Sequence, residues 1–342
     1  MNDTAIDVHG TVLDVHDAVL LDLDGTVYRG GELVPRALES IRSIHERGAA
    51  VRYVTNNASQ PARVVADRLT GFGLPASADE VATSAEAAAE LLAQKLPAGA
   101  KVLVVGSQAL AAELDNLDLV PVFAVADEPD AVVQGHSPET AWPQLAEACL
   151  AVRGGALWVA CNEDVTLPTE RGELPGNGAM VAALRAATGR QPEVAGKPER
   201  PLLDRASSSA AATEPIMVGD RMDTDIAGAV NSGMPSLLVF TGVDQAADLL
   251  AAPAGLRPDY VANDLSGLAA PRPEIAIGEK SGWKVAERGS ALELAAMSDR
   301  DHDPLTALRA MCAAWWQRGS GQVAVRPADQ RAGAALAALG LD

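Results

Sequence analysis

Two aspartates stand one residue apart at the end of an apolar run, in AVLLDLDGTVYRG at residues 18–30. Side chains at i and i+2 of an extended strand share a face, so Asp22 and Asp24 can act on one substrate. Paired carboxylates are suited to nucleophilic attack and to proton transfer. This stretch alone leaves an alternative, a buried strand followed by an acidic turn, because Asp and Gly are common turn residues.

A second acidic strand end lies in EPIMVGDRMDTDIAG, residues 214–228, where Asp220, Asp223 and Asp225 follow an apolar run. In open parallel sheets, ligands bind outside the carboxyl ends of the strands. Several carboxylates at that edge need a counter-charge, and oxygen ligands favour Mg²⁺. The spacing lacks the order and the glycine of an EF-hand loop, which argues against calcium. Asp223 can equally be a surface acid.

Donors suited to phosphate follow elsewhere in the chain. Thr55, Asn56 and Asn57 come directly after the apolar run of VRYVTNNAS, and Lys197 lies in EVAGKPER. Lys197 is followed by proline, whereas a P-loop lysine is followed by Ser or Thr. Each of these residues, taken singly, has the composition of an ordinary loop. Their order along the chain, together with the two aspartate strand ends, carries the interpretation.

Composition limits the possible partners. The 342 residues include 46 acidic and 27 basic side chains, a formal net charge of −19, which opposes binding to nucleic acid and to anionic membranes. The three widely spaced cysteines predict neither a disulfide framework nor a zinc site and favour a reducing cytoplasm. The segment MNDTAIDVHG shows no signal peptide, and no apolar run approaches the ~18 residues of a membrane span.

Alternating apolar runs and helical patterns predict an α/β fold with a doubly wound parallel sheet. Strands are expected at 18–23, 49–54, 101–105, 131–134, 156–161, 215–219, 236–240 and 259–262. Helices are expected at 35–47, 61–70, 84–95, 138–151, 176–188, 199–209 and 224–231. Pro271 and Pro273 indicate a linker. Beyond it, a small α+β appendage is expected, with a hairpin at 282–296, a helix at 303–318, a strand at 322–326 and a helix at 328–339.

The ordered motifs resemble those of the haloacid dehalogenase superfamily. They are DLDGT at residues 22–26, Thr55-Asn56-Asn57, Lys197, and Gly219-Asp220 with Asp225. Lys197 lies 142 positions after Thr55, which leaves room for an inserted cap, and ACNEDVTLP, PGNGAM and GKP resemble the nitrophenylphosphatase-type branch. The chain as a whole resembles actinobacterial glycerol-3-phosphate phosphatases.

The resemblance implies a Rossmann-like phosphatase core at 1–80 plus 190–270, an α/β cap at 81–189 and the appendage at 278–342. It implies a cytoplasmic, Mg²⁺-dependent phosphomonoester hydrolase that acts in glycerophospholipid metabolism, and a homodimer would be in keeping with the branch. Glycerol 3-phosphate is the expected substrate. Phosphoglycolate, pyridoxal phosphate and nucleotides are the alternatives within the branch.

The resemblance also implies residue roles. Asp22 is the expected nucleophile, forming an aspartyl-phosphate, and Asp24 is the general acid and then the general base. Mg²⁺ is held by Asp22, by the backbone carbonyl of Asp24 and by Asp220, while Asp225 acts through waters or Lys197. Thr55, Asn56, Asn57 and Lys197 bind the phosphate. The candidates in the cap for selecting the leaving group are Asn162, Asp164, Arg171 and Asn177, for which an ordinary loop role is an equal alternative.

Two rival functions use similar residues. A receiver-like phosphoacceptor switch also combines an acidic Mg²⁺ site with Thr and Lys, but Asp24 and the long insert argue against it. A non-catalytic binding protein on the same scaffold is disfavoured because every motif residue is present. Multiple turnover of a phosphomonoester distinguishes the enzyme from both.

Overall fold

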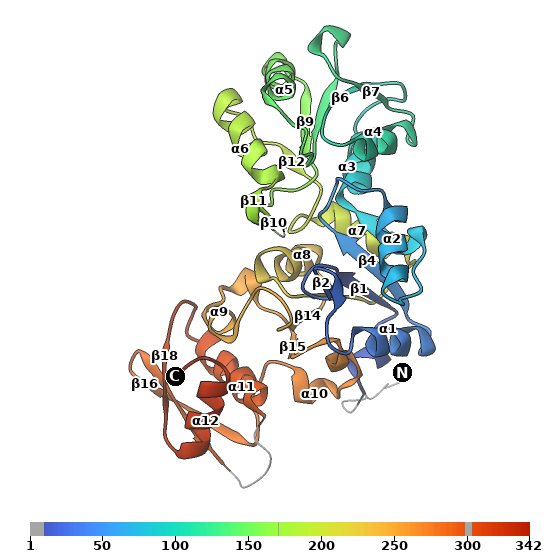
Figure 1. Ribbon diagram of the computed structural model, residues 1–342. Coiled ribbons are helices and arrows are strands. Elements are labelled where there is room, and N and C mark those ends of the chain that lie inside the picture. The colour runs from blue at the N-terminus through green and yellow to red at the C-terminus, as the bar shows by residue number, and fades with distance from the viewer. Residues whose placement is uncertain (1–9, 170, 298–302) are drawn as a thin grey trace, which may run out of the picture. The chain divides into compact units, whose positions relative to one another are not determined.

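The computed structural model describes residues 10–169, 171–297 and 303–342 (Figure 1). The predicted absence of a signal peptide concerns residues 1–9 above all, which lie outside the described residues. The chain forms two compact units, unit 1 with residues 1–51 and 212–342 and unit 2 with residues 52–211. Across the described residues, no helix is both long enough and apolar enough to cross a membrane.

The sheet of unit 1 places two carboxylate-bearing strands side by side. Its parallel strands follow the order β15-β14-β13-β1, and Leu21 of β1 is in register with Val218 of β13. Because the two strands run in the same direction, Asp22 and Asp220 emerge at the same edge. The strand bounds are β1 (Ala18–Asp22), β13 (Pro215–Gly219), β14 (Ser236–Val239) and β15 (Tyr260–Ala262).

Shorter elements surround this sheet. A hairpin of β2 (Tyr28–Arg29) and β3 (Glu32–Leu33), which the sequence pattern did not predict, follows β1 directly. The helix expected at 224–231 begins earlier, as a π-helical turn over Met222–Ile226. The helices are α1 (Ala37–Glu46), α8 (Ala227–Ser232), α9 (Ala246–Ala251) and α10 (Arg272–Ile275), with short 3-10 helices at Val12–Asp14, Ala254–Leu256 and Leu265–Ala269.

The segment interpreted as a linker is an ordered part of unit 1. Pro271 pairs with Thr11 in an isolated bridge, Ala276 pairs with Tyr260, and α10 lies between them with Ile275 buried. Proline can start a short helix because the first helical N–H needs no partner. The two prolines therefore begin a helix here instead of marking a flexible connection.

The C-terminal elements appear where the sequence pattern predicted them. β16 (Trp283–Arg288) and β17 (Ala291–Ala296) form the expected hairpin, and β18 (Ala324–Pro327) pairs in parallel with β17. The helices are α11 (Pro304–Trp316) and α12 (Gln330–Ala338). Asp303 caps α11 by accepting the N–H of Leu305, as its position before Pro304 predicted.

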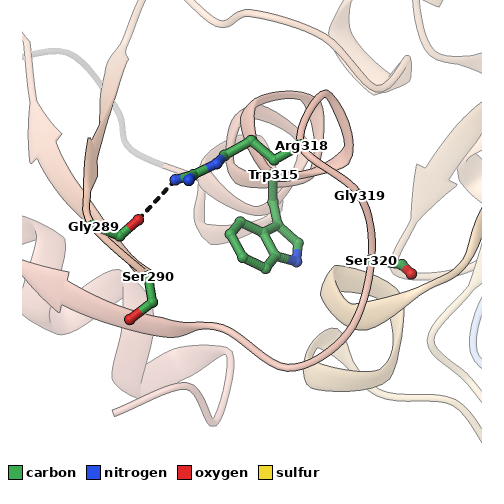
Figure 2. Close-up of a pocket in the computed structure, with 6 residues that line it drawn as sticks. All are labelled: Gly289, Ser290, Trp315, Arg318, Gly319 and Ser320. Carbon is green, nitrogen blue, oxygen red and sulfur yellow. Dashed lines mark hydrogen bonds between the residues drawn. The ribbon is translucent and has the colours of Figure 1, made fainter.

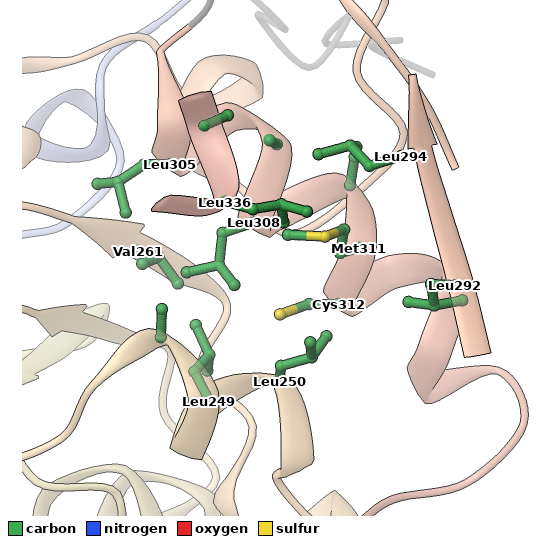
Figure 3. Packing of buried hydrophobic residues seen from close by; sticks show 14 of the residues in the cluster. Leu249, Leu250, Val261, Leu292, Leu294, Leu305, Leu308, Met311, Cys312 and Leu336 are labelled. Carbon is green, nitrogen blue, oxygen red and sulfur yellow. The ribbon is translucent and has the colours of Figure 1, made fainter. Parts of the chain in front are cut away.

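The C-terminal elements share one hydrophobic cluster with the sheet of unit 1 (Figure 3). Leu249 and Val261, from α9 and β15, belong to the same cluster as Leu308 and Met311 of α11. The buried guanidinium of Arg309 donates through Nε and Nη2 to the carbonyl oxygen of Val261, at 3.1 and 2.7 Å. The appendage is therefore packed into the core of unit 1.

Unit 2 contains a second, separate parallel sheet of order β12-β9-β8-β6-β7, drawn in green in Figure 1. It also contains the parallel pair of β4 (Ala50–Thr55) and β5 (Val81–Thr83), and the antiparallel hairpin of β10 (Thr166–Thr169) and β11 (Gly172–Pro175). The other strands are β6 (Lys101–Val105), β7 (Val120–Val122), β8 (Ala131–Gln134), β9 (Leu157–Ala160) and β12 (Glu193–Val194).

The helices of unit 2 are α2 (Ala62–Gly71), α3 (Ser84–Ala93), α4 (Gln108–Asp115), α5 (Trp142–Gly154), α6 (Asn177–Thr188) and α7 (Arg200–Ser209), with 3-10 helices at Ala78–Glu80 and Val125–Asp127. The helix expected at 138–151 begins only at Trp142. Ser137 ends the preceding segment in a turn, its carbonyl accepting the N–H of Thr140 and its hydroxyl accepting that of Glu139. Those bonds satisfy the backbone that a longer helix would have used.

Candidate active site

Three carboxylates converge at the carboxyl edge of the unit 1 sheet. Ligand oxygens of Asp22, Asp220 and Asp225, the carboxylate cluster, lie within 4.8 Å of one another, and no other such group occurs among the residues that the structure describes. Asp220 and Asp225 are buried, and Asp22 is half-buried. Like charges this close and this buried require a counter-cation to remain ionised together. The donor set, oxygen only, fits Mg²⁺.

Asp220 is held by neutral donors on both oxygens. The hydroxyl of Thr26 donates to Oδ1 at 3.2 Å, and the backbone N–H of Val243 donates to Oδ2 at 2.8 Å. Hydrogen bonds to the ionised form favour it over the protonated form. Thr26 belongs to the DLDGT motif, but the contribution of Val243 is invisible in the sequence because Val243 lies 23 residues beyond Asp220, in the turn after β14.

The two other aspartates of the second acidic motif point to different environments. Asp225 is buried and accepts the N–H of Arg221 at 3.1 Å. Asp223 is exposed and pairs with the Arg221 guanidinium at 2.8 Å. A Cβ at Gly219 would lie 2.2 Å from Oδ2 of Asp225, so only glycine leaves room for that carboxylate. Asp223 is the surface acid that the sequence left as an alternative.

Asp24 lies in the tight turn that follows β1, and its side chain is exposed. Leu23 accepts the N–H groups of Val27 and Tyr28, at 2.9 and 3.1 Å, and Gly25 donates to Tyr28 at 2.8 Å. Gly25 has φ +92°, a left-handed conformation that glycine adopts without strain. The turn leaves Asp24 accessible, which its expected role in exchanging protons with substrate and water would require.

The other predicted site residues belong to unit 2. Thr55 ends β4 and is buried, and its hydroxyl accepts the N–H of Asn57 at 3.1 Å. The side chain of Asn56 holds the backbone of Lys197 in both directions: Oδ1 accepts its N–H at 2.8 Å, and Nδ2 donates to its carbonyl at 3.0 Å. The Lys197 side chain is 2% exposed. Asn56 therefore positions Lys197.

Two further asparagines extend this arrangement into an asparagine network, formed by Asn56, Asn162 and Asn177. Asn162 Nδ2 donates to the carbonyl of Asn56 at 2.6 Å, and Asn177 Nδ2 donates to the carbonyls of Asn162 and Gln134 at 2.8 and 3.2 Å. Asn162 and Asn177 are buried. Their expected role in selecting the leaving group is untested, but these contacts join loops, which is the alternative that the sequence offered.

One curated relative decides the family. The D-glycerol 3-phosphate phosphatase of Mycobacterium tuberculosis is 45% identical over 336 residues, which cover 95% of this chain and 94% of that protein. Models of haloacid dehalogenase-like hydrolases match residues 19–120 and 194–268. The chain belongs to the haloacid dehalogenase-like hydrolases.

Solved structures of other family members agree. The glycerol phosphate phosphatase of M. tuberculosis in complex with magnesium has a TM-score of 0.93 and 45% identity, covering 98% of this chain and 100% of that one. The calcium complex of the same protein has a TM-score of 0.92. A 4-nitrophenylphosphatase of Thermotoga maritima has a TM-score of 0.70 and 32% identity over 75% of this chain and 98% of that one.

Substrates vary among the family members that this chain resembles. A 5'-nucleotidase of Bacillus subtilis is 38% identical over 233 residues, 68% of this chain and 90% of that protein. The C-terminal residues 280–341, where the sequence predicted a small α+β appendage, match a model of a GCN5-related N-acetyltransferase-like domain.

A pocket of about 360 Å³ lies in this C-terminal region (Figure 2). Arg318 donates to the Gly289 carbonyl across it at 2.8 Å and lies 5.9 Å from the Trp315 ring. Glu287 also pairs with Arg318, at 3.2 Å. No residue of the predicted site lines the pocket, whose walls are Gly289, Ser290, Trp315, Arg318, Gly319 and Ser320.

Proposed function

We propose that this hydrolase is a Mg²⁺-dependent glycerol-3-phosphate phosphatase. The observation that carries the proposal is the carboxylate cluster in a chain that matches the M. tuberculosis D-glycerol 3-phosphate phosphatase over 95% of its length. A match over 95% of the chain includes most of the C-terminal appendage, whereas the match to the B. subtilis 5'-nucleotidase covers 68% of the chain. This shared organisation favours glycerol 3-phosphate over the other substrates of the branch.

Asp22 is the proposed nucleophile and Asp24 the proposed acid–base residue. A carboxylate oxygen of Asp22 forms a bond to phosphorus while the bond to the glycerol oxygen breaks, and Asp24 gives its proton to that oxygen. Asp24 then takes a proton from water, which attacks the aspartyl-phosphate and releases inorganic phosphate. Asp22 is returned as a carboxylate.

The metal ligands proposed are Asp22, the backbone carbonyl of Asp24, and Asp220, with Asp225 supporting them from its buried position. Bound Mg²⁺ would neutralise charge so that an anionic nucleophile can approach an anionic phosphate. Thr55, Asn56, Asn57 and Lys197 are proposed as phosphate-binding residues from the order of the motifs. The hydrogen bonds of Asn56 support a further role for it, that of holding the Lys197 backbone.

Phosphate release from a substrate panel tests the proposal. Glycerol 3-phosphate should give kcat/KM at least about tenfold above phosphoglycolate, pyridoxal phosphate and nucleoside monophosphates, a difference that a few pocket contacts can supply. EDTA should abolish turnover and Mg²⁺ restore it. Ca²⁺, which accepts bidentate carboxylates, should bind and inhibit. Preference for another phosphomonoester would contradict glycerol 3-phosphate as the substrate. A single phosphorylation of the protein without turnover would favour the receiver-like switch.

Further proposals concern the compartment, the domain division and the oligomeric state. We propose a cytoplasmic enzyme of glycerophospholipid metabolism, and the three free cysteines, Cys149, Cys161 and Cys312, support a reducing compartment. We keep the division into a core at 1–80 plus 190–270, a cap at 81–189 and an appendage at 278–342. A homodimer without nucleic-acid partners is proposed from the branch resemblance and from the net charge of −19. Light scattering tests the oligomeric state.

A further inference from the structure

The turn that follows β14, Thr241–Asp244, contacts both the side chain and the main chain of Asp220. The N–H of Val243 donates to Asp220 Oδ2 at 2.8 Å. The next N–H along the chain, that of Asp244, donates to the carbonyl oxygen of Asp220 at 3.2 Å. Two consecutive residues thus restrain the backbone and the carboxylate of Asp220 together.

The 241–244 turn is itself fastened to the segment that carries the other motif aspartates. The hydroxyl of Thr241 donates to the carbonyl of Gly25 at 2.5 Å, next to Asp24 in the chain. The guanidinium of Arg29, on β2, donates to the carbonyls of Thr241 and Gly242. The turn after β14 therefore connects the end of β1 with the end of β13.

A third contact reaches the π-helical turn that carries Asp225. The carboxylate of Asp244 accepts the backbone N–H of Met222, the first residue of that turn. Asp244 is half-buried and its own N–H is bonded to Asp220. It follows that the 241–244 turn contacts or adjoins each of the three segments that supply carboxylates to the cluster.

The packing against Asp220 leaves no space for a side chain in the turn. A Cβ built at Gly242 would lie 1.7 Å from Asp220 Oδ2 and 2.2 Å from its Cγ. Real Cβ atoms do not approach so closely, so main chain alone can lie against this face of the carboxylate. The turn therefore blocks rotation of the Asp220 carboxylate as well as donating to it.

We propose that the 241–244 turn is the positioning element for Asp220, and that Thr241 is its anchor. The inference rests on the proposed metal site. Thr26 and Val243 each occupy one carboxylate oxygen, and Thr241 holds Val243 in place through Gly25. Groups that orient a metal ligand in this way commonly change metal affinity by about 10–100-fold when they are removed.

Magnesium binding by calorimetry, without substrate, tests the proposal on the full chain. Thr241→Val keeps the shape and removes the hydroxyl, and should weaken Mg²⁺ binding by about 10–100-fold. Thr241→Ser keeps the donor and should restore affinity. Thr213→Val is the matched control, because its hydroxyl bonds Asp17 at the opposite end of β13. It should bind Mg²⁺ like the parent protein.

The kinetic signature separates positioning from damage to the fold. The Thr241→Val enzyme should need more Mg²⁺ for half-maximal turnover but recover most of its kcat at saturating Mg²⁺. Arg29→Met, an exposed substitution, should weaken binding in the same direction and covers the case in which Thr241→Val does not fold. Parent-like Mg²⁺ affinity in the folded variants, or equal losses with serine and valine at 241, would overturn the inference. A parent protein that binds Mg²⁺ but releases no phosphate would instead overturn the proposed function.

Discussion

The carboxylate cluster and the asparagine network are both groups of largely buried polar side chains that lie beyond the ends of strands, yet they are stabilised differently. In the network, the amides bond neighbouring backbone: Asn56 pairs with both the N–H and the carbonyl of Lys197, and Asn177 donates to two carbonyls while its own Oδ1 accepts no hydrogen bond from the described residues. In the cluster, three acids lie within 4.8 Å, and the neutral donors around Asp220 cannot cancel their charge. Buried amides that are satisfied in this way stabilise a fold, whereas crowded buried acids store repulsion that a cation relieves.

The largest expected effect comes from Asp22→Asn. Turnover should fall by at least about 10⁴-fold, the order found when a nucleophile is removed, and no phosphoenzyme should form. The metal-free protein should be at least as stable as the parent, because one of three repelling charges is gone. Rapid-quench trapping and thermal unfolding in EDTA measure the two effects. Asp223→Asn, on the exposed acid paired with Arg221, is the matched control. Phosphate trapped on another residue would refute the assignment.

Asp24→Asn should separate chemistry from metal binding. Loss of the proton donor lowers turnover by about 10²–10⁴-fold. Mg²⁺ affinity should stay close to that of the parent, because the proposed ligand at this residue is the backbone carbonyl. Calorimetry alongside steady-state kinetics makes the measurement. A joint loss of affinity and turnover would show that the exposed carboxylate itself belongs with the cluster.

Leu308→Ala tests the stability that apolar packing contributes, as a reference for the carboxylate cluster and the asparagine network. Leu308 is fully buried in the cluster shared by α11, α9 and β15. Its truncation should cost about 2–5 kcal/mol in the free energy of unfolding, with turnover of the folded fraction retained. Urea unfolding followed by kinetics below the transition provides the test. Leu150→Ala, on an exposed side chain, is the control, and equal destabilisation there would contradict the argument.

Asn177→Ala should lower stability more than turnover, the opposite of Asp22→Asn. It leaves the carbonyls of Gln134 and Asn162 without this donor, at a cost of about 1–3 kcal/mol in stability. Turnover of the folded enzyme should change far less. Urea unfolding measures stability, and Asn116→Ala, which removes an exposed amide, is the control. A variant of parental stability that loses substrate selection would return Asn177 to its predicted role in the cap.

The smallest effect concerns pH and lies at the amino end of β1. Burial lowers the pKa of His16, and its Nδ1 bonds the carbonyl of Glu214 at 3.0 Å. The unfolded chain, with a histidine pKa near ~6.5, therefore binds more protons than the folded one, and stability falls as pH drops below that value. His16→Gln should reduce the fall of the melting temperature between neutral and mildly acidic pH. An unchanged slope in His16→Gln would assign the dependence to other groups.

The longer core strands and both acidic strand ends could be predicted from the sequence, because apolar runs and the turn residues after them are local features. The short strands β2, β3, β5, β7, β10, β11 and β12 were not predicted. β1 and β13 appear where their apolar runs indicated. Two predictions were wrong. The helix expected at 138–151 begins later because the Ser137 hydroxyl accepts the N–H of Glu139 in a turn, and the segment at Pro271 is not a linker because it forms bridges to residues far away in the sequence. The roles of Asp22, Asp24, Thr55 and Lys197 stay predictions.

The sequence by itself determined the family, the order of the motifs and the presence of acids at two strand ends. Only the tertiary structure decided that Asp225 faces inward while Asp223 pairs with Arg221 outside. It also decided that the N–H of Val243 donates to the Asp220 carboxylate. The physical reason is that a local pattern sets which backbone conformations are favourable, whereas a buried polar atom must find its partner wherever packing brings one, in this molecule 23 residues away along the chain.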